Sequence, residues 1–373
     1  MWVTLTACSA TPSGSAPARE PPEPRSGQLD PSFGDGGLVR LDSVELPFLS
    51  ALAPLPDGGA VVAGADLYQV QLVRVDRDGA VDPSFGAGAL DGLGTPLQAE
   101  VDDQGRIWLA GARLPTGGYV LRLEADGTPD PTWGGGGLAT AVDDALGFEV
   151  VLDPDGGAVG VADTSTEVVA VRFDADGLQD PTFADAGELV VSSGASAYSQ
   201  SAAGSPAGVV AATSDGRVFA FGWDGTDLRT LGTGSGSWIS SVAADADGLW
   251  VGTTAGAGYD ADARVERWDL DGALDPTWGD EGAWQAGEGE SSVGRLLPYP
   301  DGRLLVGGFR SGSTSDLWRL DASGARDPEW GREGESELPV LFYGTAGGLP
   351  GIGADGVYVA GGGYTPFVAR LLP

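Results

Sequence analysis

One short phrase recurs along the chain and restricts the folds that it can adopt. Asp-Pro-[Ser/Thr/Glu]-[Phe/Trp] occurs repeatedly, with its aromatic residue at Phe33, Phe85, Trp133, Phe183, Trp278 and Trp330. In the long gap between Phe183 and Trp278, Leu231-Gly232 stands at the expected position, so neighbouring units lie 47 to 52 residues apart. A fixed period of this length indicates an array of similar supersecondary units.

A second series of turns has the same period. Its seven members are Asp57-Gly58, Gln104-Gly105, Asp155-Gly156, Ala207-Gly208, Asp247-Gly248, Asp301-Gly302 and Asp355-Gly356. Each turn joins two apolar runs, and a third run of alternating character then leads to the Asp-Pro phrase and a last short run. Four short antiparallel strands per unit are typical of a propeller blade. The sequence therefore predicts an all-β fold, a seven-bladed β-propeller of four-stranded antiparallel blades over residues 27–373.

The two ends of the chain predict how the ring closes. The seventh unit stops after its third run, "FVARLLP", and the missing Asp-Pro phrase and last strand stand at the other end, at residues 29–41. We therefore predict that the N-terminal strand joins the C-terminal blade. Because closure hides two sheet edges, deletion of residues 27–41 is expected to leave an insoluble or oligomeric protein.

The end of each unit has a specific pattern: Arg, a hydrophobic residue, two variable residues, Asp or Ser, Gly, and then Asp-Pro-[Ser/Thr]-[Phe/Trp]-Gly after two more. It resembles the delta-60 repeat of secreted and surface proteins of bacteria. The resemblance covers residues 27–373 and departs at the fourth unit, where residues 228–232 replace the Asp-Pro-aromatic core. It implies a β-propeller and no defined activity, because a fold does not by itself supply a function.

Residues 1–26 predict a lipobox remnant and a disordered tether. Leu5-Thr6-Ala7-Cys8 resembles a bacterial lipobox, and the Pro/Ser-rich stretch behind it is typical of a linker. A signal peptide needs a basic start and roughly 7–15 apolar residues before that Cys, so we expect translation to start further upstream. We expect lipidation at Cys8 and an extracytoplasmic location, as a lipoprotein of the outer membrane or cell surface or as a secreted protein. The alternative is a free cysteine in a disordered tail.

Composition excludes several classes of function. The formal net charge of −34 repels phosphate backbones, so we expect no nucleic-acid partner, and membrane contact only through Cys8. The chain has no His and no Lys, which excludes Ser-His-Asp and Cys-His catalysis and Schiff-base chemistry. We therefore expect a monomer that is not an enzyme, with an unknown protein, peptide or glycan as its partner.

The recurring Asp-x-Asp-Gly turns raise the question of calcium. They occur at Asp76/Asp78, Asp174/Asp176, Asp245/Asp247 and Asp269/Asp271. A calcium loop of the EF-hand type needs a further oxygen ligand and a bidentate Glu, which the following residues do not supply. A hairpin turn explains the pattern, because Asp bonds its own backbone and Gly adopts a positive φ. We expect no cofactor and no metal, with calcium as the alternative.

The variable loops on one face of the predicted ring are the candidate ligand-binding region, because function on a rigid scaffold concentrates in loops. They lie before the first strand of each blade and between its second and third strands. Their candidate residues are Phe48, Tyr68, Tyr119, Phe148, Tyr198, Trp238, Tyr259, Arg264, Phe309, Arg310 and Tyr364. The alternative for the aromatic residues is local packing between blades.

Three functions remain open at the level of sequence. The first is a non-catalytic binding or scaffold protein, lipid-anchored outside the cytoplasm. The second is a carboxylate- or Tyr-based hydrolase or lyase on polysaccharide or peptide, with its site in the central channel. The third is a purely structural surface protein. Converging channel carboxylates with raised pKa values would favour the enzyme, and a channel of small or apolar groups would favour the binding protein.

Overall fold

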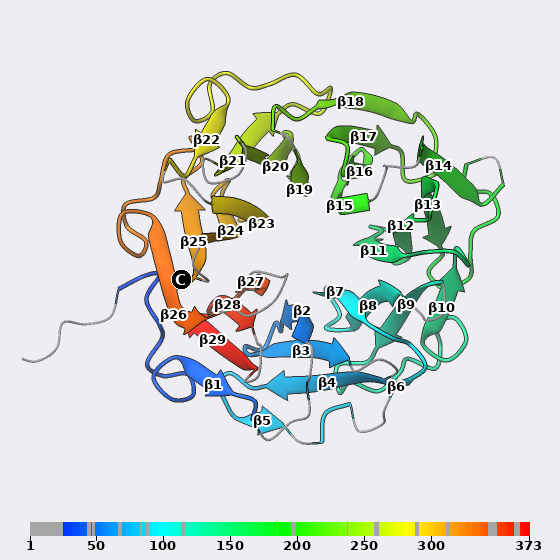
Figure 1. Ribbon diagram of the computed structural model, residues 1–373. Coiled ribbons are helices and arrows are strands. Elements are labelled where there is room, and N and C mark those ends of the chain that lie inside the picture. The colour runs from blue at the N-terminus through cyan, green and yellow to red at the C-terminus, as the bar shows by residue number, and fades with distance from the viewer. Residues whose placement is uncertain are drawn as a thin grey trace, which may run out of the picture.

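Seven antiparallel sheets stand around a central axis in the computed structural model (Figure 1). This arrangement confirms the predicted seven-bladed β-propeller. The structure describes residues 25–373 apart from 43–45, 47–48, 66–68, 83, 87–89, 113–116, 185, 195–198, 237, 257–260, 288–290, 311–313, 342–348 and 362–365. None of these described residues forms a helix of the length and apolarity needed to cross a membrane.

The strands form four rings, and each blade contributes one strand to each ring, except that the first blade has two short outermost strands. The innermost strands are β2 (Leu49–Pro54), β7 (Pro96–Val101), β11 (Gly147–Leu152), β15 (Ser199–Ser205), β19 (Ile239–Ala244), β23 (Ser291–Pro298) and β27 (Leu349–Gly353). The second strands are β3 (Ala60–Ala65), β8 (Ile107–Ala112), β12 (Ala158–Asp163), β16 (Gly208–Thr213), β20 (Leu249–Ala255), β24 (Leu304–Arg310) and β28 (Gly356–Gly361).

The two outer rings complete the blades. The third strands are β4 (Gln69–Val75), β9 (Gly118–Leu123), β13 (Glu167–Phe173), β17 (Arg217–Phe221), β21 (Asp262–Trp268), β25 (Thr314–Leu320) and β29 (Phe367–Leu371). The outermost strands are β5 (Val81–Asp82), β6 (Leu90–Asp91), β10 (Leu138–Ala141), β14 (Glu188–Ser193), β18 (Arg229–Thr233), β22 (Ala283–Gln285), β26 (Glu335–Leu341) and β1 (Leu38–Arg40). β5 and β6 both pair with β4.

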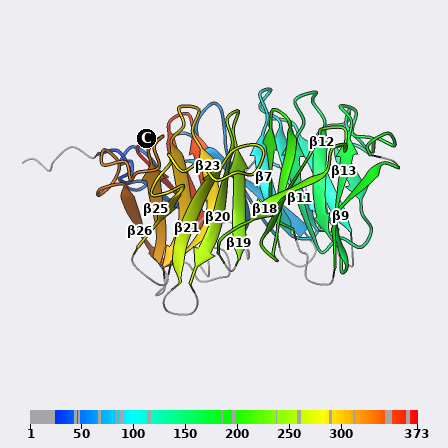
Figure 2. The ribbon, with the colours of Figure 1, turned by 90° about the horizontal axis from the view of Figure 1, so that it is seen from above.

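The second strands form the dry interior of the ring. Every residue of β3, "AVVAGA", is buried, and the same holds for β12 and β16. A strand covered on both faces has no polar side to its pattern, which explains its continuous apolar sequence. Figure 2 shows the ring edge-on, with the strands running between its two faces.

The N-terminal strand closes the ring, as predicted. β1 pairs antiparallel with β29, with Leu38 opposite Ala369 and Arg40 opposite Phe367. Figure 1 shows the blue β1 beside the red β29. The C-terminal blade is therefore assembled from both ends of the described chain.

The Asp-Pro-aromatic phrase connects neighbouring blades. Its aromatic side chains are buried, and in several copies the residue that follows donates its backbone N–H to the turn that ends the third strand of the next blade. The N–H of Gly34 lies 2.9 Å from the carbonyl oxygen of Asp78, and that of Gly134 lies 2.7 Å from the carbonyl oxygen of Asp176. The phrase is therefore a structural turn at the end of a blade, and its aromatic side chain packs between two blades.

The N-terminal segment also supplies the corresponding contact between the sixth and seventh blades. The seventh blade ends at Pro373 without its own Asp-x-Asp-Gly turn. Ser26 and Gly27 take that place, because the Gly331 N–H donates to the Ser26 carbonyl oxygen at 2.8 Å. Gly27 has a φ of +77°, and a Cβ there would lie 2.5 Å from the Gly331 nitrogen. The contacts that close the ring therefore begin at Ser26, just before residue 27.

Candidate functional site: the central channel

A cavity of about 920 Å³ occupies the middle of the ring. Its walls come chiefly from the innermost strands β7, β11, β15, β19, β23 and β27. Much of the lining is small: Ser201, Ala202, Ala203 and Gly204 on β15, and Ser240, Ser241, Val242, Ala243 and Ala244 on β19. Small side chains keep the channel open where the blades converge.

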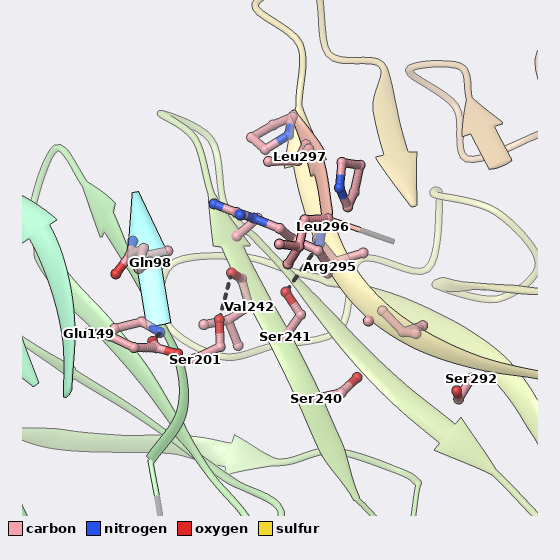
Figure 3. Close-up of a pocket in the computed structure, with 18 of the residues that line it drawn as sticks. Gln98, Glu149, Ser201, Ser240, Ser241, Val242, Ser292, Arg295, Leu296 and Leu297 are labelled. Atoms are coloured by element: carbon pink, nitrogen blue, oxygen red, sulfur yellow. Dashed lines mark hydrogen bonds between the residues drawn. The ribbon is translucent and has the colours of Figure 1, made fainter. Parts of the chain in front are cut away.

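Two glutamates line the cavity from the innermost strands of neighbouring blades. Glu149 belongs to β11 (Figure 3), and its Oε2 accepts the Ala202 N–H at 2.6 Å. Glu100 belongs to β7, and its Oε1 accepts the Gln98 amide at 2.7 Å. Gln98 also exchanges two hydrogen bonds with the Val150 backbone, at 2.7 and 3.0 Å. The two carboxylates are therefore positioned by the backbones of three blades.

Burial sets the acidity of these two glutamates. Burial raises the pKa of Glu149 to about 7, and the negative charges of Asp163 and Glu100 add to the rise. The Ala202 N–H and the Arg295 charge act against it. Burial also raises the pKa of Glu100, while Arg295 and the Gln98 amide lower it. Near neutral pH, the protonated and the ionised forms of Glu149 are therefore both populated.

Among the described residues that line the cavity, Arg295 is the one with a positive charge. Arg295 lies on β23, and Figure 3 shows its side chain extending from that strand toward the side of the channel that carries Gln98 and Glu149. Its charge lowers the pKa of both glutamates. Within the described part of the chain, no hydrogen bond or ion pair engages the Arg295 guanidinium. The site thus has opposite charges on different walls.

Apolar side chains surround one mouth of the channel. Trp238 and Phe309 line the cavity and are 53% and 45% exposed, and Leu97 is 43% exposed. Trp238 directly precedes β19, Leu97 lies at the start of β7, and Phe309 pairs with Ser292 at the start of β23. Because the innermost strands all run in one direction along the channel, these three side chains share one face of the ring.

The predicted loop residues lie in different environments in the structure: some line the cavity and others are buried. Trp238 and Phe309 line the cavity, whereas Tyr119 and Phe148 are 0% and 1% exposed. The expectation that these two side chains face a ligand is wrong, because they pack between neighbouring blades. A Cβ on Gly118 would lie 2.0 Å from the Phe148 ring, so this ring fills the space between β9 and β11.

The predicted arginines lie away from the cavity lining. Arg264 donates to Glu266 at 3.1 Å, and Arg310 lies 2.8 Å from Glu335. Both act in ion pairs within their own blades. The remaining candidates lie outside the described residues: Cys8, Phe48, Tyr68, Tyr198, Tyr259 and Tyr364.

Sequence reasoning missed the charged residues of the channel. Glu100, Glu149 and Arg295 each stand in a first strand that is otherwise apolar or small, in "PLQAEV", "GFEVVL" and "SSVGRLLP". Comparison of the seven first strands within the chain would have marked these positions as departures. The sequence has 74 charged residues, so no single one of them stands out, and the prediction therefore relied on the loops.

The Asp-x-Asp-Gly turns use their carboxylates locally. Asp76 Oδ1 accepts the backbone N–H groups of Asp78 and Ala80 at 2.9 and 2.8 Å, and Gly79 has a φ of +89°. Asp174 and Asp269 make the same pair of bonds. Among the residues that the structure describes, no group of three or more His, Cys, Asp or Glu is arranged to hold a metal.

Comparison with known proteins supports the architecture. Residues 55–85, 105–132 and 300–329 match the model of a family described as "Domain of unknown function (DUF5122) beta-propeller". No curated protein matches the chain. A chain in "Crystal Structure of Mitotic Checkpoint Complex" aligns with a TM-score of 0.59 and 13% identity, covering 99% of both chains. A chain in "Crystal structure of Nidogen/Laminin Complex" has a TM-score of 0.43 and 13% identity, covering 68% of this chain and 85% of that one. The family match and the seven sheets identify the chain as a β-propeller repeat protein, and the alignment with the mitotic checkpoint complex chain agrees with that fold.

Proposed function

We propose that the protein is a non-catalytic binding propeller that holds its ligand in the central channel. The observation that carries this proposal is the cavity of about 920 Å³, which combines charged groups from three blades with an apolar mouth. Ligand sites are concave, largely apolar and equipped with a few oriented polar groups. The small side chains of β15 and β19 favour binding in the same way.

A ligand screen with a channel variant tests this proposal. Peptides, glycans and soluble surface proteins are screened by the shift in melting temperature of the purified propeller. Arg295→Ala is expected to abolish the shift, while Arg40→Ala, an exposed change on β1, is expected to preserve it. A ligand whose shift is equal in both variants would contradict the channel as its site. No ligand at all would favour a purely structural surface protein.

The proposal includes a location outside the cytoplasm and an anchor at Cys8. The lipobox-like Leu5-Thr6-Ala7-Cys8 and the tether behind it support this part. We expect labelled palmitate to enter the protein in its native host, and Cys8→Ser to abolish labelling and release the protein from membranes. Unchanged fractionation of Cys8→Ser would contradict the anchor.

One observation favours a second candidate, a carboxylate-based hydrolase or lyase. The pKa of Glu149 is raised to about 7, and Glu100 lines the same cavity. A carboxyl with such a pKa suits general acid–base work at neutral pH. Product formation from a polysaccharide or peptide, lost in Glu149→Gln, would replace the binding proposal with this one.

A further inference from the structure

We propose that the channel ligand is a small zwitterion, an amino acid or short peptide with free ends. Its ammonium group binds at Glu100 and Glu149, and its carboxylate binds Arg295. This inference rests on the proposed function and specifies the ligand class of the same site. Three features carry it: the free oxygens of the acidic wall, the unpaired guanidinium across the channel and the apolar mouth.

The acidic wall has room for a hydrogen-bond donor. One oxygen of each carboxylate is occupied, by the Ala202 N–H on Glu149 and by the Gln98 amide on Glu100. No described residue donates to the other oxygen of either group. An ammonium group carries three donors and one positive charge, which suits two carboxylate oxygens on adjacent strands.

The opposite wall selects the other end of the ligand. The planar guanidinium of Arg295 can form two parallel hydrogen bonds to a carboxylate, and no described side chain occupies it. A neutral ligand such as a plain glycan would displace water from three charged groups without pairing them, which is costly. A zwitterion pairs each charge with its opposite and is oriented by the two walls.

The mouth gives the ligand's side chains a surface to contact. Trp238, Phe309 and Leu97 are exposed at the entrance while the charges lie deeper, on the strands. Apolar or aromatic side chains of a peptide would bury area against them. The probe should therefore carry apolar side chains and both free ends.

Four probes test the contributions of the ammonium group and of the carboxylate, and distinguish a peptide ligand from a free amino acid. They are the dipeptide Leu-Phe, its N-acetylated form, its C-terminal amide and free phenylalanine, titrated into the full chain by calorimetry. We expect Leu-Phe to bind and each blocked form to lose at least about tenfold in affinity, the effect of one charge-assisted pair. Tighter binding of Leu-Phe indicates a peptide ligand, and equal binding of phenylalanine indicates an amino acid.

Variants assign each end to a wall. Glu149→Gln should weaken Leu-Phe but not N-acetyl-Leu-Phe, and Arg295→Gln should weaken Leu-Phe but not its amide. Glu188→Gln, an exposed change on β14, is the matched control and should bind as the wild type does. Affinity for Leu-Phe should rise from about pH 5.5 to about pH 7 in the wild type, because the ammonium group needs ionised Glu149 and the α-amino group of the ligand keeps its proton over this range. This rise should vanish in Glu149→Gln.

The outcomes separate this inference from the proposed function. Equal affinities of blocked and free Leu-Phe would show that the charges do not select the ligand. If no probe binds while the ligand screen yields a channel ligand of another class, the zwitterion is wrong and the binding function stands. If no ligand from either experiment depends on Arg295, both proposals fail.

Discussion

The backbone position after each repeat aromatic requires a left-handed conformation. Gly34, Gly134 and Gly331 have φ values of +55°, +52° and +58° there. In the fourth copy, Ala184 occupies this position with a φ of +51°, and its N–H still donates to Asp224 at 2.9 Å. Alanine in this region is strained because its Cβ approaches its own backbone, whereas glycine is not.

We predict that Ala184→Gly stabilises the protein. Relief of the left-handed strain should raise the free energy of unfolding by about 1 kcal/mol, which is measured by urea denaturation of the variant and the wild type. The matched control is Ala175→Gly, at an exposed position without a positive φ, which should destabilise slightly because glycine gains entropy in the unfolded chain. Destabilisation in both variants would contradict the strain argument.

The acidity of Glu149 has a consequence for stability. Its pKa is about 7 in the folded protein and near 4.3 in an unfolded chain, so the folded state binds more protons between these values. The free energy of unfolding should therefore fall as pH rises from 5 to 7.

We predict that Glu149→Gln removes this fall. The glutamine oxygen can still accept the Ala202 N–H, and the variant should be more stable than the wild type at pH 8 by on the order of 1 kcal/mol. Urea denaturation at pH 5, 6, 7 and 8 measures the difference. A pH dependence parallel to the wild type would show that the buried charge is not Glu149.

At the scale of elements, the closing segment pairs β1 with β29 and so joins the two ends of the described chain through non-covalent contacts. Arg370 on β29 lies 2.7 Å from Asp30, and both side chains are buried. The pair repeats a contact seen inside other blades, such as Arg122 with Asp130 at 2.7 Å. Here it joins the two ends of the chain rather than neighbours in sequence.

We predict that Asp30→Ala weakens closure more than the same change in an internal copy of the phrase. Loss of Asp30 leaves the buried Arg370 with one carboxylate partner, Asp355 at 2.9 Å, and should cost about 2 kcal/mol. Asp82→Ala, in the first blade, removes a carboxylate that bonds chiefly to Ser84 and should cost much less. Thermal melting and size-exclusion chromatography measure both, and equal losses would contradict a special role of the closing blade.

Deletion of residues 27–41 tests the closure as a whole. It exposes the edge of β29 and also removes Gly27, which packs against Gly331. We expect insoluble or oligomeric protein, because an open strand edge recruits other chains. A soluble, monomeric deletion variant would show that the remaining blades close without β1.

At the scale of the whole molecule, charge opposes the compact state. The sequence has 54 acidic and 20 basic residues, so ion pairs can neutralise only a minority of the carboxylates. Self-repulsion of the remainder destabilises the fold and is screened by salt.

We predict that the melting temperature rises by several degrees from about 0.01 M to about 0.5 M NaCl, where the Debye length falls well below 10 Å. MgCl₂ and CaCl₂ at equal ionic strength should give equal rises, because the described Asp-x-Asp-Gly carboxylates bond to their own backbones. A larger rise with CaCl₂ would reveal a specific calcium site.

The sequence by itself determined the architecture, because each blade is specified by local features. Strand length, alternation and turn residues act within about 50 residues, and their repetition predicted seven blades and the strand exchange at residues 29–41. Even the role of Phe33 and its equivalents as wedges followed from repetition, since a feature needed in every blade serves packing.

The tertiary structure decided what lies in the channel. Glu100, Glu149 and Arg295 are 49 and 146 residues apart in succession, and only ring closure brings their strands around one cavity. It also decided that Tyr119 and Phe148 are core residues, because loop and strand boundaries fix which aromatic side chains point between blades. Burial, charge coupling and exposure depend on distances between blades, which no local pattern encodes.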